Sequence, residues 1–511
     1  MITLLVSQSA FARTYGRAVD DRATSITRLS GGGYAVAGWT MASGFFDVLV
    51  MKLDNNGNLG WAERFGGSQD DYARCVIQTY DGNLVVSGTG QASGADNQFF
   101  VLKTDTLGSL IWARRFSGPG QDYGWKVSET RDSGLVMVGV SESYGNDYLD
   151  FLVIRMDSLG NLVWARSFGG TTGGGEWGYA IAATSDGGCL VAGETSSFVP
   201  GGGVDWLVVK LDPSGGTEWA EALGWAGRDI PQHVIQTTGG DYVLAGLIGT
   251  GSDYEFMVVR LDPSGGITWA KRANMVPGVG TMWDQASCVI ETSDGGFVAV
   301  GGMDVLGGPN QDGYFLILKL DGSGNFLWAR EFNMGGNEVA LSIVEAPDGG
   351  LVVAGGTDGL GAGGEDIFVI KLDANGNYTG EAGCVNVLTP AVATPSLNTA
   401  WPTVGEDCVP NAASMTPSPT VLSPSVTDVC EPVYEGTEES GKSGSDQDIR
   451  SAPVPGGALF ISPGEVPLRI YAVDGKLICS RILGKGENRI SLDRGVYLWM
   501  AGKRNGKIAV R

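Results

Sequence analysis

Histidine is almost absent from this chain, because His233 is the one histidine among 511 residues. Histidine is the commonest general base and a frequent zinc ligand, so its scarcity excludes a multi-histidine metal site and most histidine-based catalysis. The seven cysteines include no CxxC pair and no cluster with zinc-site spacing. A Ser/His/Asp or Cys/His arrangement, a P-loop and a GxGxxG in a strand–helix context are also missing.

Positive charge and long apolar runs are scarce as well. The formal net charge is −23 and the pI is about 4.4, which argues against a nucleic-acid partner, since that would require a basic face. No apolar run reaches the ~20 residues of a membrane-spanning helix. Charged residues make up only 18% while glycines number 82, so the composition indicates a turn-rich β protein rather than a disordered acidic chain.

What the chain has in abundance is a repeat of the type Asn161-Leu-Val-Trp-Ala-Arg-Ser-Phe-Gly-Gly170. A Trp-Ala pair marks each full copy, at Trp61, Trp112, Trp164, Trp219, Trp269 and Trp328. Successive copies are 50 to 59 residues apart, and Phe11-Ala-Arg-Thr-Tyr-Gly16 is a weaker copy 50 residues before Trp61. A period near 50 is typical of closed or stacked arrays, in which each unit packs on its neighbours. We interpret the tryptophans as packing anchors.

Each repeat contains four short β-type runs punctuated by Gly and Asp, which we designate strands A to D in chain order. Seven A strands begin at Ser25, Cys75, Lys126, Ala180, His233, Cys288 and Ser342. The seventh repeat lacks a good D strand, whereas Phe11–Gly16 is a D strand without its A, B and C. The sequence therefore predicts an all-β, seven-bladed β-propeller of four-stranded blades, whose last blade is closed by the N-terminal strand.

The composition divides the chain into four segments. Residues 1–10 are typical of the rear of a secretory signal peptide without its basic start, and residues 11–383 form the propeller. Residues 384–455 are rich in Pro, Ser and Thr and indicate an extended linker. Residues 456–511 regain a β pattern, with Asp-Gly and Asn-Gly turns, and predict a small C-terminal β-sandwich.

The cysteines fit this division. Cys75 and Cys288 occupy the same position in non-adjacent repeats, which predicts that they do not meet and that they pack as small hydrophobic side chains. Cys384, Cys408 and Cys430 lie in the linker, where one disulfide would be expected if the protein is exported.

The last segment resembles the C-terminal sorting domain of the bacterial type nine secretion system. The resemblance rests on Ile470-Tyr-Ala-Val-Asp-Gly-Lys476, Asn488-Arg-Ile-Ser-Leu-Asp-Arg-Gly-Val-Tyr-Leu-Trp499 and Asn505-Gly-Lys-Ile-Ala-Val-Arg511. The usual Asn-Pro opening is reduced to Ile461-Ser-Pro-Gly464, and the match covers about a tenth of the chain. It implies translocation across an outer membrane, removal of this domain, and release or surface attachment. Partners would then include the secretion machinery.

The repeats themselves resemble bacterial secreted β-propeller repeats, with Ser293-Asp-Gly-Gly296 and Lys210-Leu-Asp212 as good instances. This resemblance covers most of residues 11–383 and implies a propeller without a particular activity.

An acid precedes every A strand by four residues. The set consists of Asp21, Asp71, Asp122, Glu176, Asp229, Asp284 and Glu338. In a propeller these residues would form a ring on one face, because each D-to-A connection returns from the rim to the axis. One interpretation is a cation site, since clustered carboxylates suit Ca²⁺; no other cofactor is expected. The other is that each acid fixes its own turn by accepting backbone N–H bonds.

Aromatic residues gather on the same D-to-A connections. They are Tyr72, Tyr123, Trp125, Trp177, Trp225 and Trp283. Exposed aromatic rings beside carboxylates suit a carbohydrate, because the rings stack on the apolar sugar face and the carboxylates accept from hydroxyls. The alternative is packing between blades, where large aromatic residues are usually buried.

A basic residue also recurs, one position before each Leu-Asp-like pair. This set is Lys52, Lys103, Arg155, Lys210, Arg260, Lys319 and Lys371. An anion-binding ring is one interpretation, and pairing with neighbouring acids such as Glu63 or Glu221 is the other.

These features together predict a secreted or cell-surface, non-enzymatic propeller that binds an extracellular glycan or a surface protein. One alternative is a propeller hydrolase or lyase acting on extracellular polysaccharide, which would need carboxylates in different environments within one cleft. Another is a structural surface-layer component, which would bury the aromatic residues between blades.

Overall fold

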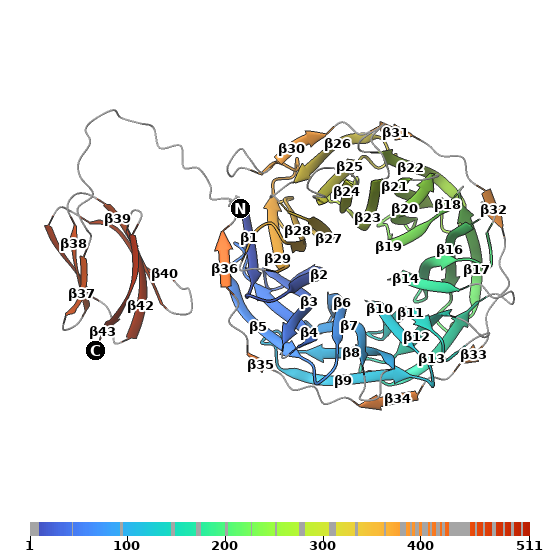
Figure 1. Ribbon diagram of the computed structural model, residues 1–511, viewed down its shortest axis with the longest axis horizontal. Coiled ribbons are helices and arrows are strands. Elements are labelled where there is room, and N and C mark those ends of the chain that lie inside the picture. Colours follow the sequence, from blue (N-terminus) through green and yellow to red (C-terminus); the bar gives the residue numbers. More distant parts are fainter. Residues whose placement is uncertain are drawn as a thin grey trace. The chain divides into compact units, whose positions relative to one another are not determined.

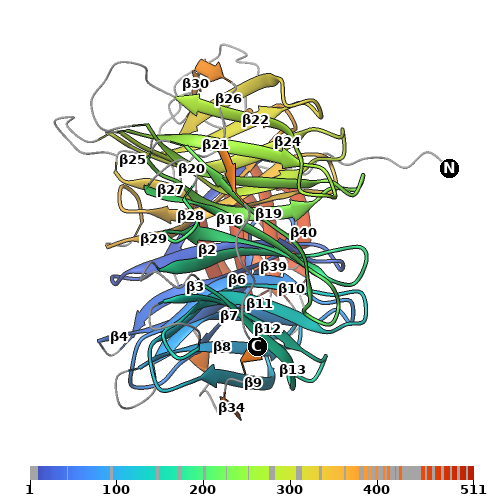
Figure 2. The same ribbon diagram turned by 90° about the vertical axis from the view of Figure 1, so that its right-hand side faces the viewer.

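A computed structural model shows a seven-bladed β-propeller with four-stranded antiparallel blades (Figure 1). It describes residues 10–378 apart from residues 43, 92–95, 145–148, 170–174, 200–202, 226, 251–252, 275–281, 306–312, 333–335 and 362–363; beyond residue 378 it describes the backbone of strands alone. The predicted signal segment therefore lies outside the described residues, except for Ala10. Seen from the side, the inner strands β2 (Asp21–Arg28) and β6 (Asp71–Gln78) run roughly along the ring axis (Figure 2).

The strands follow one another from the axis outward in each blade. Blades 1 to 3 are β2, β3 (Tyr34–Ala42), β4 (Phe45–Leu53), β5 (Leu59–Phe65); β6, β7 (Leu84–Gln91), β8 (Asn97–Thr104), β9 (Leu110–Ser117); and β10 (Asp122–Glu129), β11 (Leu135–Ser141), β12 (Asp150–Met156), β13 (Leu162–Phe168). Blades 4 and 5 are β14 (Glu176–Ala183), β15 (Cys189–Thr195), β16 (Gly203–Leu211), β17 (Thr217–Gly224); and β19 (Ile230–Gln236), β20 (Tyr242–Thr250), β21 (Asp253–Leu261), β22 (Ile267–Asn274). A two-residue strand, β18 (Gly227–Arg228), pairs with β16. Blades 6 and 7 are β23 (Met282–Glu291), β24 (Phe297–Val305), β25 (Gly313–Leu320), β26 (Phe326–Phe332); and β27 (Glu338–Glu345), β28 (Leu351–Thr357), β29 (Asp366–Leu372), β1 (Phe11–Gly16).

The ring closes through the N-terminal strand, as predicted. β1 pairs antiparallel with β29, with Arg13 opposite Val369. The Phe11 ring lies where a Cβ on Gly57 would stand, and the Tyr15 hydroxyl donates to the Gly57 carbonyl. These contacts join blade 7 to blade 1, so the two ends of the repeat array hold each other.

The tryptophan anchors join each blade to the next in the same way. Trp61 covers Gly108 of the following blade, and its indole N–H donates to the Thr106 carbonyl at 3.1 Å. Trp164 and Trp219 make the equivalent bonds to the carbonyls of Pro213 and Pro263. Between these anchors, hydrophobic clusters fill each space between neighbouring blades from their middle strands. Because each unit packs on both neighbours, the core is distributed around the ring.

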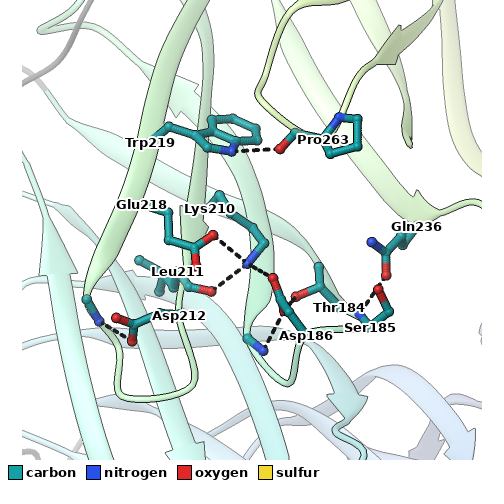
Figure 3. Close-up of polar contacts among 12 residues, drawn as sticks. Thr184, Ser185, Asp186, Lys210, Leu211, Asp212, Glu218, Trp219, Gln236 and Pro263 are labelled. Atoms are coloured by element: carbon teal, nitrogen blue, oxygen red, sulfur yellow. Dashed lines mark hydrogen bonds and ion pairs between the residues drawn. The ribbon is translucent and has the colours of Figure 1, made fainter. Parts of the chain in front are cut away.

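The recurring basic residues pair with acids, but the acids differ from those we expected. Lys210 forms ion pairs with Asp186 at 2.7 Å and with Glu218 at 3.1 Å (Figure 3). Asp186 lies in the A-to-B turn of the same blade, where the Thr184 hydroxyl also donates to it. The equivalent turn acids bind the basic residue in five other blades, as the pairs Lys103–Asp81, Arg155–Asp132, Arg260–Asp241, Lys319–Asp294 and Lys371–Asp348. Six members of the set therefore join strands within their own blade, whereas Lys52 donates to the Thr106 carbonyl of blade 2.

Seven short strands from residues 385–428 run around the rim of the propeller. These strands, here called the outer belt, are β30 (Val385–Leu388), β31 (Ala391–Ala393), β32 (Asn398–Ala400), β33 (Asp407–Cys408), β34 (Asn411–Ser414), β35 (Thr420–Val421) and β36 (Ser425–Asp428). They pair antiparallel, in that order, with β26, β22, β17, β13, β9, β5 and β1 (Figure 1). The belt thus gives each blade a fifth strand and makes one circuit against the blade order. Its last strand covers β1, which closes the ring.

The chain divides into two units, Met1–Val433 and Tyr434–Arg511. The second unit contains two sheets. One is formed by β37 (Arg450–Val454), β38 (Gly457–Ser462) and β41 (Gly486–Ser491), and the other by β40 (Leu477–Leu483), β39 (Val466–Ala472), β42 (Gly495–Ala501) and β43 (Arg504–Val510). The sandwich arrangement and the sorting function stay predictions. Within the described residues no helix is long and apolar enough to cross a membrane.

Candidate functional site

The inner strands carry the candidate site. They surround the axis (Figure 1), and part of their side chains is exposed. β6 and β10 share one burial pattern, in which the first, third and sixth residues are buried and the second, fourth and fifth are partly exposed. A β-bulge recurs between the third and the fifth or sixth residue of these strands and their equivalents. Such a bulge places one extra residue on the same strand edge. Side chains at the three partly exposed positions therefore approach the axis.

Blades 1 to 4 contain two groups of contacting aromatic rings, here called together the aromatic arc. Its members are Trp39, Phe46, Tyr72, Tyr123, Trp125, Trp177 and Tyr179. Five of the rings come from inner strands, whereas Trp39 lies on β3 and Phe46 on β4. Within blades 3 and 4, Trp177 stacks on Tyr179 with ring centres 6.4 Å apart and planes 18° apart, and on Tyr123 at 6.1 Å and 27°. Such offset stacking suits the quadrupoles of the rings and fixes their faces.

Arg74 joins the two halves of the arc. Its guanidinium carbon lies 5.7 Å from the Tyr72 ring centre and 4.5 Å from that of Trp125, which is cation–π geometry. Burial, with the nearby charge of Arg22, lowers the pKa of Arg74 to about 10. No carboxylate among the described residues forms an ion pair with Arg74. The arc therefore contains a cation that is balanced by aromatic faces alone.

Polar groups mark the far end of the arc. The Tyr179 hydroxyl donates to Glu194 at 3.2 Å, and Arg228 forms an ion pair with the same carboxylate at 3.0 Å. Burial and the Glu194 charge raise the pKa of Tyr179, so its phenol stays protonated. A phenol in this state is a hydrogen-bond donor and a poor general base.

Four of the six predicted aromatic residues belong to the arc: Tyr72, Tyr123, Trp125 and Trp177, all half-buried. Trp225 does not. It is only 7% exposed and packs edge-on against Trp206 with centres 5.8 Å apart, so it belongs to the core. Trp283 is the second residue of β23, opposite Tyr254, and its side chain lies outside the described residues.

Sequence reasoning missed four residues of the arc. Trp39 and Phe46 lie on β3 and β4, and Arg74 and Tyr179 lie on inner strands. Arg74 and Tyr179 occupy the fourth position of an inner strand, equivalent to Trp125. Both residues lie within the inner strand itself, whereas the sequence predicts the site on the D-to-A connections. An alignment of the repeats would have revealed them, because three successive repeats have Arg, Trp and Tyr at the same strand position.

The seven acids lie inside the blades. All are at most 8% exposed: Asp21, Asp71, Asp122, Glu176, Asp229, Asp284 and Glu338. Asp21, Asp122 and Asp229 each accept from the backbone N–H four residues earlier, at 2.7–2.8 Å. In these three blades the acid therefore fixes its own turn, as the second interpretation predicted. Moreover, no three His, Cys, Asp or Glu side chains among the described residues gather as ligands for one metal ion.

The acids differ in what faces them across the blade. Asp122 pairs in register with Ser141, whose hydroxyl donates to it, and Asp21 receives the same bond from Thr40. Asp71 instead faces Gly90, which has no donor side chain. Asp71 also lines a small cavity of about 20 Å³ with apolar walls. Burial, together with the Asp47 carboxylate, raises the pKa of Asp71 to about 7.

Asp229, three blades away, is likewise a buried acid without a side-chain donor. It accepts only backbone N–H groups, from Trp225 and Gly249, and burial with the nearby Asp205 raises its pKa to about 7. The two acids with a pKa of about 7 thus lie in blades 2 and 5. They do not form the paired carboxylates of one cleft that a glycoside hydrolase uses.

Comparisons with known proteins match the fold at low similarity. No family model and no curated protein matches the chain. Among solved structures, Sqt1 from Chaetomium thermophilum has a TM-score of 0.40 and 11% identity, covering 73% of this chain and 100% of its own. A protein of unknown function from Dyadobacter fermentans has a TM-score of 0.40 and 13% identity over 72% and 98%. The polysaccharide lyase Uly1 has a TM-score of 0.42 and 10% identity over 69% and 90%. Likenesses this distant indicate no activity for this chain.

Proposed function

We propose that this protein is a non-enzymatic binding propeller whose aromatic arc takes a glycan at the ring axis. The observation that carries the proposal is the continuous series from Tyr72 through Arg74, Trp125 and Tyr179 to Trp177. Half-exposed rings offer flat apolar faces to the C–H face of a sugar. Arg74 supplies donors for hydroxyl groups at its edge, and the Tyr179 hydroxyl, whose proton goes to the buried Glu194, keeps an oxygen that can accept from them.

A glycan-array screen of the full chain tests this function, followed by calorimetry with the best oligosaccharide. Trp177→Ala should weaken binding about tenfold or more. The comparison is with a nucleic-acid base, whose stacking on one aromatic ring contributes about 1–3 kcal/mol. Trp177→Phe should lose less, since it keeps a flat ring. Tyr80→Ala is the matched control, because Tyr80 is 69% exposed in the turn at the opposite end of β6. Absence of saturable binding by folded protein would remove the glycan proposal and favour a protein ligand.

The alternative is a polysaccharide hydrolase or lyase. The pKa values of Asp71 and Asp229, both about 7, favour this enzyme, because a general acid needs a pKa near the working pH. The burial of the two acids in separate blades weighs against it. Release of reducing ends or of unsaturated products from the bound polysaccharide, abolished in Asp71→Asn, would support the enzyme over the binder. A structural surface-layer role remains for a protein that binds no soluble ligand.

The proposal also includes the cellular location of the protein. The motifs in residues 456–511 support export to the outer cell surface or the medium through a sorting machinery. Deleting residues 456–511 in a host with that secretion system should keep the propeller inside the cell envelope. Equal surface amounts of both forms, measured by cell fractionation and immunoblotting, would contradict this part.

A further inference from the structure

A second set of side chains surrounds the axis one residue beyond the level of Arg74 and Trp125. These seven equivalent residues, here called the axial ring, are Ser25, Cys75, Lys126, Ala180, His233, Cys288 and Ser342. They occupy the bulge on each inner strand. Lys126 and His233, the single histidine, are both partly exposed there. Neither the repeat pattern nor the glycan proposal assigns a role to them.

The axial ring follows a regular hydrogen-bond rule. In three blades a ring side chain accepts from the amide that directly follows the ring residue of the next blade, whereas the Cys75 thiol donates to the Val127 carbonyl at 3.7 Å. Ser25 accepts from Val76 at 3.1 Å, and Ser342 accepts from Ile26 at 3.1 Å. His233 accepts from the Val289 amide through Nδ1 at 3.4 Å. These amides therefore point away from strand B and toward the axis.

The rule fails at two consecutive positions. The amides of Ile181 and Val234 have the same register as Val76 and Ile26, opposite Val191 and Leu244, so they also point toward the axis. They face Lys126, which has only donors, and Ala180, which has neither donor nor acceptor. Outside strand pairing, no acceptor for these two amides occurs among the described residues.

The other groups at this place offer donors or weak acceptors: the thiols of Cys75 and Cys288 lie near Lys126, and a thiol sulfur accepts hydrogen bonds only weakly. Because His233 accepts through Nδ1, its neutral ring carries the proton on Nε2. Burial and the Lys126 charge lower the pKa of His233 well below its usual value, which keeps the ring neutral. Lys126 forms no ion pair with a carboxylate of the described residues, in a protein with a net charge of −23. Lys126, His233 and the two amides therefore combine a cation without a carboxylate partner with N–H donors that lack a strong acceptor.

We propose that Lys126, His233 and the amides of Ile181 and Val234 form an oxyanion site at the propeller axis, which takes a carboxylate or sulfate group. The ammonium supplies charge and the N–H groups supply directed bonds, as in other anion sites built from backbone amides. A free small oxyanion is one source of this group. The other is an acidic or sulfated sugar held by the neighbouring aromatic arc, and this second source rests on the proposed glycan function.

Thermal shift and calorimetry on the full chain test the site with acetate and sulfate, each against chloride at equal ionic strength. Lys126→Met should weaken sulfate binding about tenfold to a hundredfold, because hydrogen bonds to charged groups contribute about 1.5–3 kcal/mol. Ala180→Ser tests the site without removing the charge. Its hydroxyl should accept from Val234 as Ser25 does from Val76, and so weaken the oxyanion while leaving the fold intact. Lys52→Met is the control, since Lys52 is also partly exposed but lies in β4, where it donates to Thr106.

The same variants separate the two sources and the two proposals. Oxyanion binding by the wild type that Lys126→Met and Ala180→Ser lose, and Trp177→Ala keeps, supports a free-anion site. Tighter binding of a glucuronate-containing oligosaccharide than of its neutral counterpart, lost in both Lys126→Met and Trp177→Ala, supports the sugar source. Equal binding of neutral and acidic oligosaccharides, with no effect of acetate or sulfate beyond chloride, overturns the oxyanion site while leaving the glycan function in place.

Discussion

The guanidinium carbon of Arg74 lies 4.5 Å from the centre of the Trp125 ring, across the junction between blades 2 and 3. This contact joins Trp39, Phe46 and Tyr72 on one side to Tyr179 and Trp177 on the other. Without it the aromatic residues would form two separate groups. The cation therefore determines the continuity of the surface as well as its charge.

Arg74→Met should leave stability within about 1 kcal/mol of the wild type. The change removes a cation–π contact of about 0.5–2 kcal/mol, but it also removes a buried cation that has no carboxylate partner. Binding of an acidic oligosaccharide should fall more than binding of a neutral one. Urea unfolding and calorimetry measure the two effects. A stability loss well above 2 kcal/mol would mean that Arg74 has a mainly structural role.

Asp71→Asn should make the protein more stable at pH 8 and no more stable at pH 4. The folded-state pKa of Asp71 is about 7, above the value of 3.8 for an exposed aspartate, so the folded protein holds a proton that the unfolded chain has lost. Stability therefore falls as pH rises from about 4 to about 7. The three-unit difference corresponds to roughly 4 kcal/mol at most. Asparagine removes this penalty, and its amide N–H group can donate to nearby Asp47.

Chemical denaturation at several pH values measures this effect, with Asp294→Asn as the control of opposite sign. The Lys319 and Thr292 bonds lower the pKa of Asp294 to about 2. Its contribution is therefore present above pH 4 and is lost as pH falls toward 2, so Asp294→Asn should destabilise at pH 7. Parallel pH profiles for the wild type and Asp71→Asn would refute the assignment of the proton to Asp71.

Ser141→Ala should destabilise the protein more at pH 8 than at pH 4. The Ser141 hydroxyl donates to Asp122 and opposes the effect of burial, which already raises the pKa of that carboxyl. Removing the donor should move the pKa of Asp122 further upward and cost about 1.5–3 kcal/mol while the carboxylate is charged. Ser128→Ala removes a bond to a neutral amide, at 3.1 Å from Ala183, and should give a loss independent of pH.

Much of the fold could be predicted from the sequence because it is repeated. Trp61 and its equivalents, the Asp-Gly turns and the unmatched strand Phe11–Gly16 determine seven blades and their closure. The site could be predicted only in part. Tyr72, Tyr123, Trp125 and Trp177 stood out because no repeat anchor explains them. Trp225 has the same signal, but its neighbour Trp206 draws it into the core, and such a contact between two strands has no counterpart along the sequence.

The axial ring illustrates the other limit. Lys126 and His233 were recognisable as equivalent strand positions, yet their meaning depends on a bulge that turns them toward the axis and on amides of the following blade. The outer belt is harder still to predict from the sequence. Its strands of two to four residues are too short for an apolar/polar alternation that would distinguish them from a linker.

The outer belt predicts different behaviour for two truncated chains. A chain that ends at residue 383 would leave the outer edge of every blade unpaired, from β5 in blade 1 to β1 in blade 7. Open strand edges pair with other molecules, so this form should melt at a lower temperature and self-associate. A chain that ends at residue 433 keeps all seven belt strands and should match the full protein in melting temperature and remain monodisperse.

Light scattering after size exclusion and thermal unfolding distinguish the two truncated chains. Identical behaviour of both truncated chains would show that the belt contributes nothing to the closed ring.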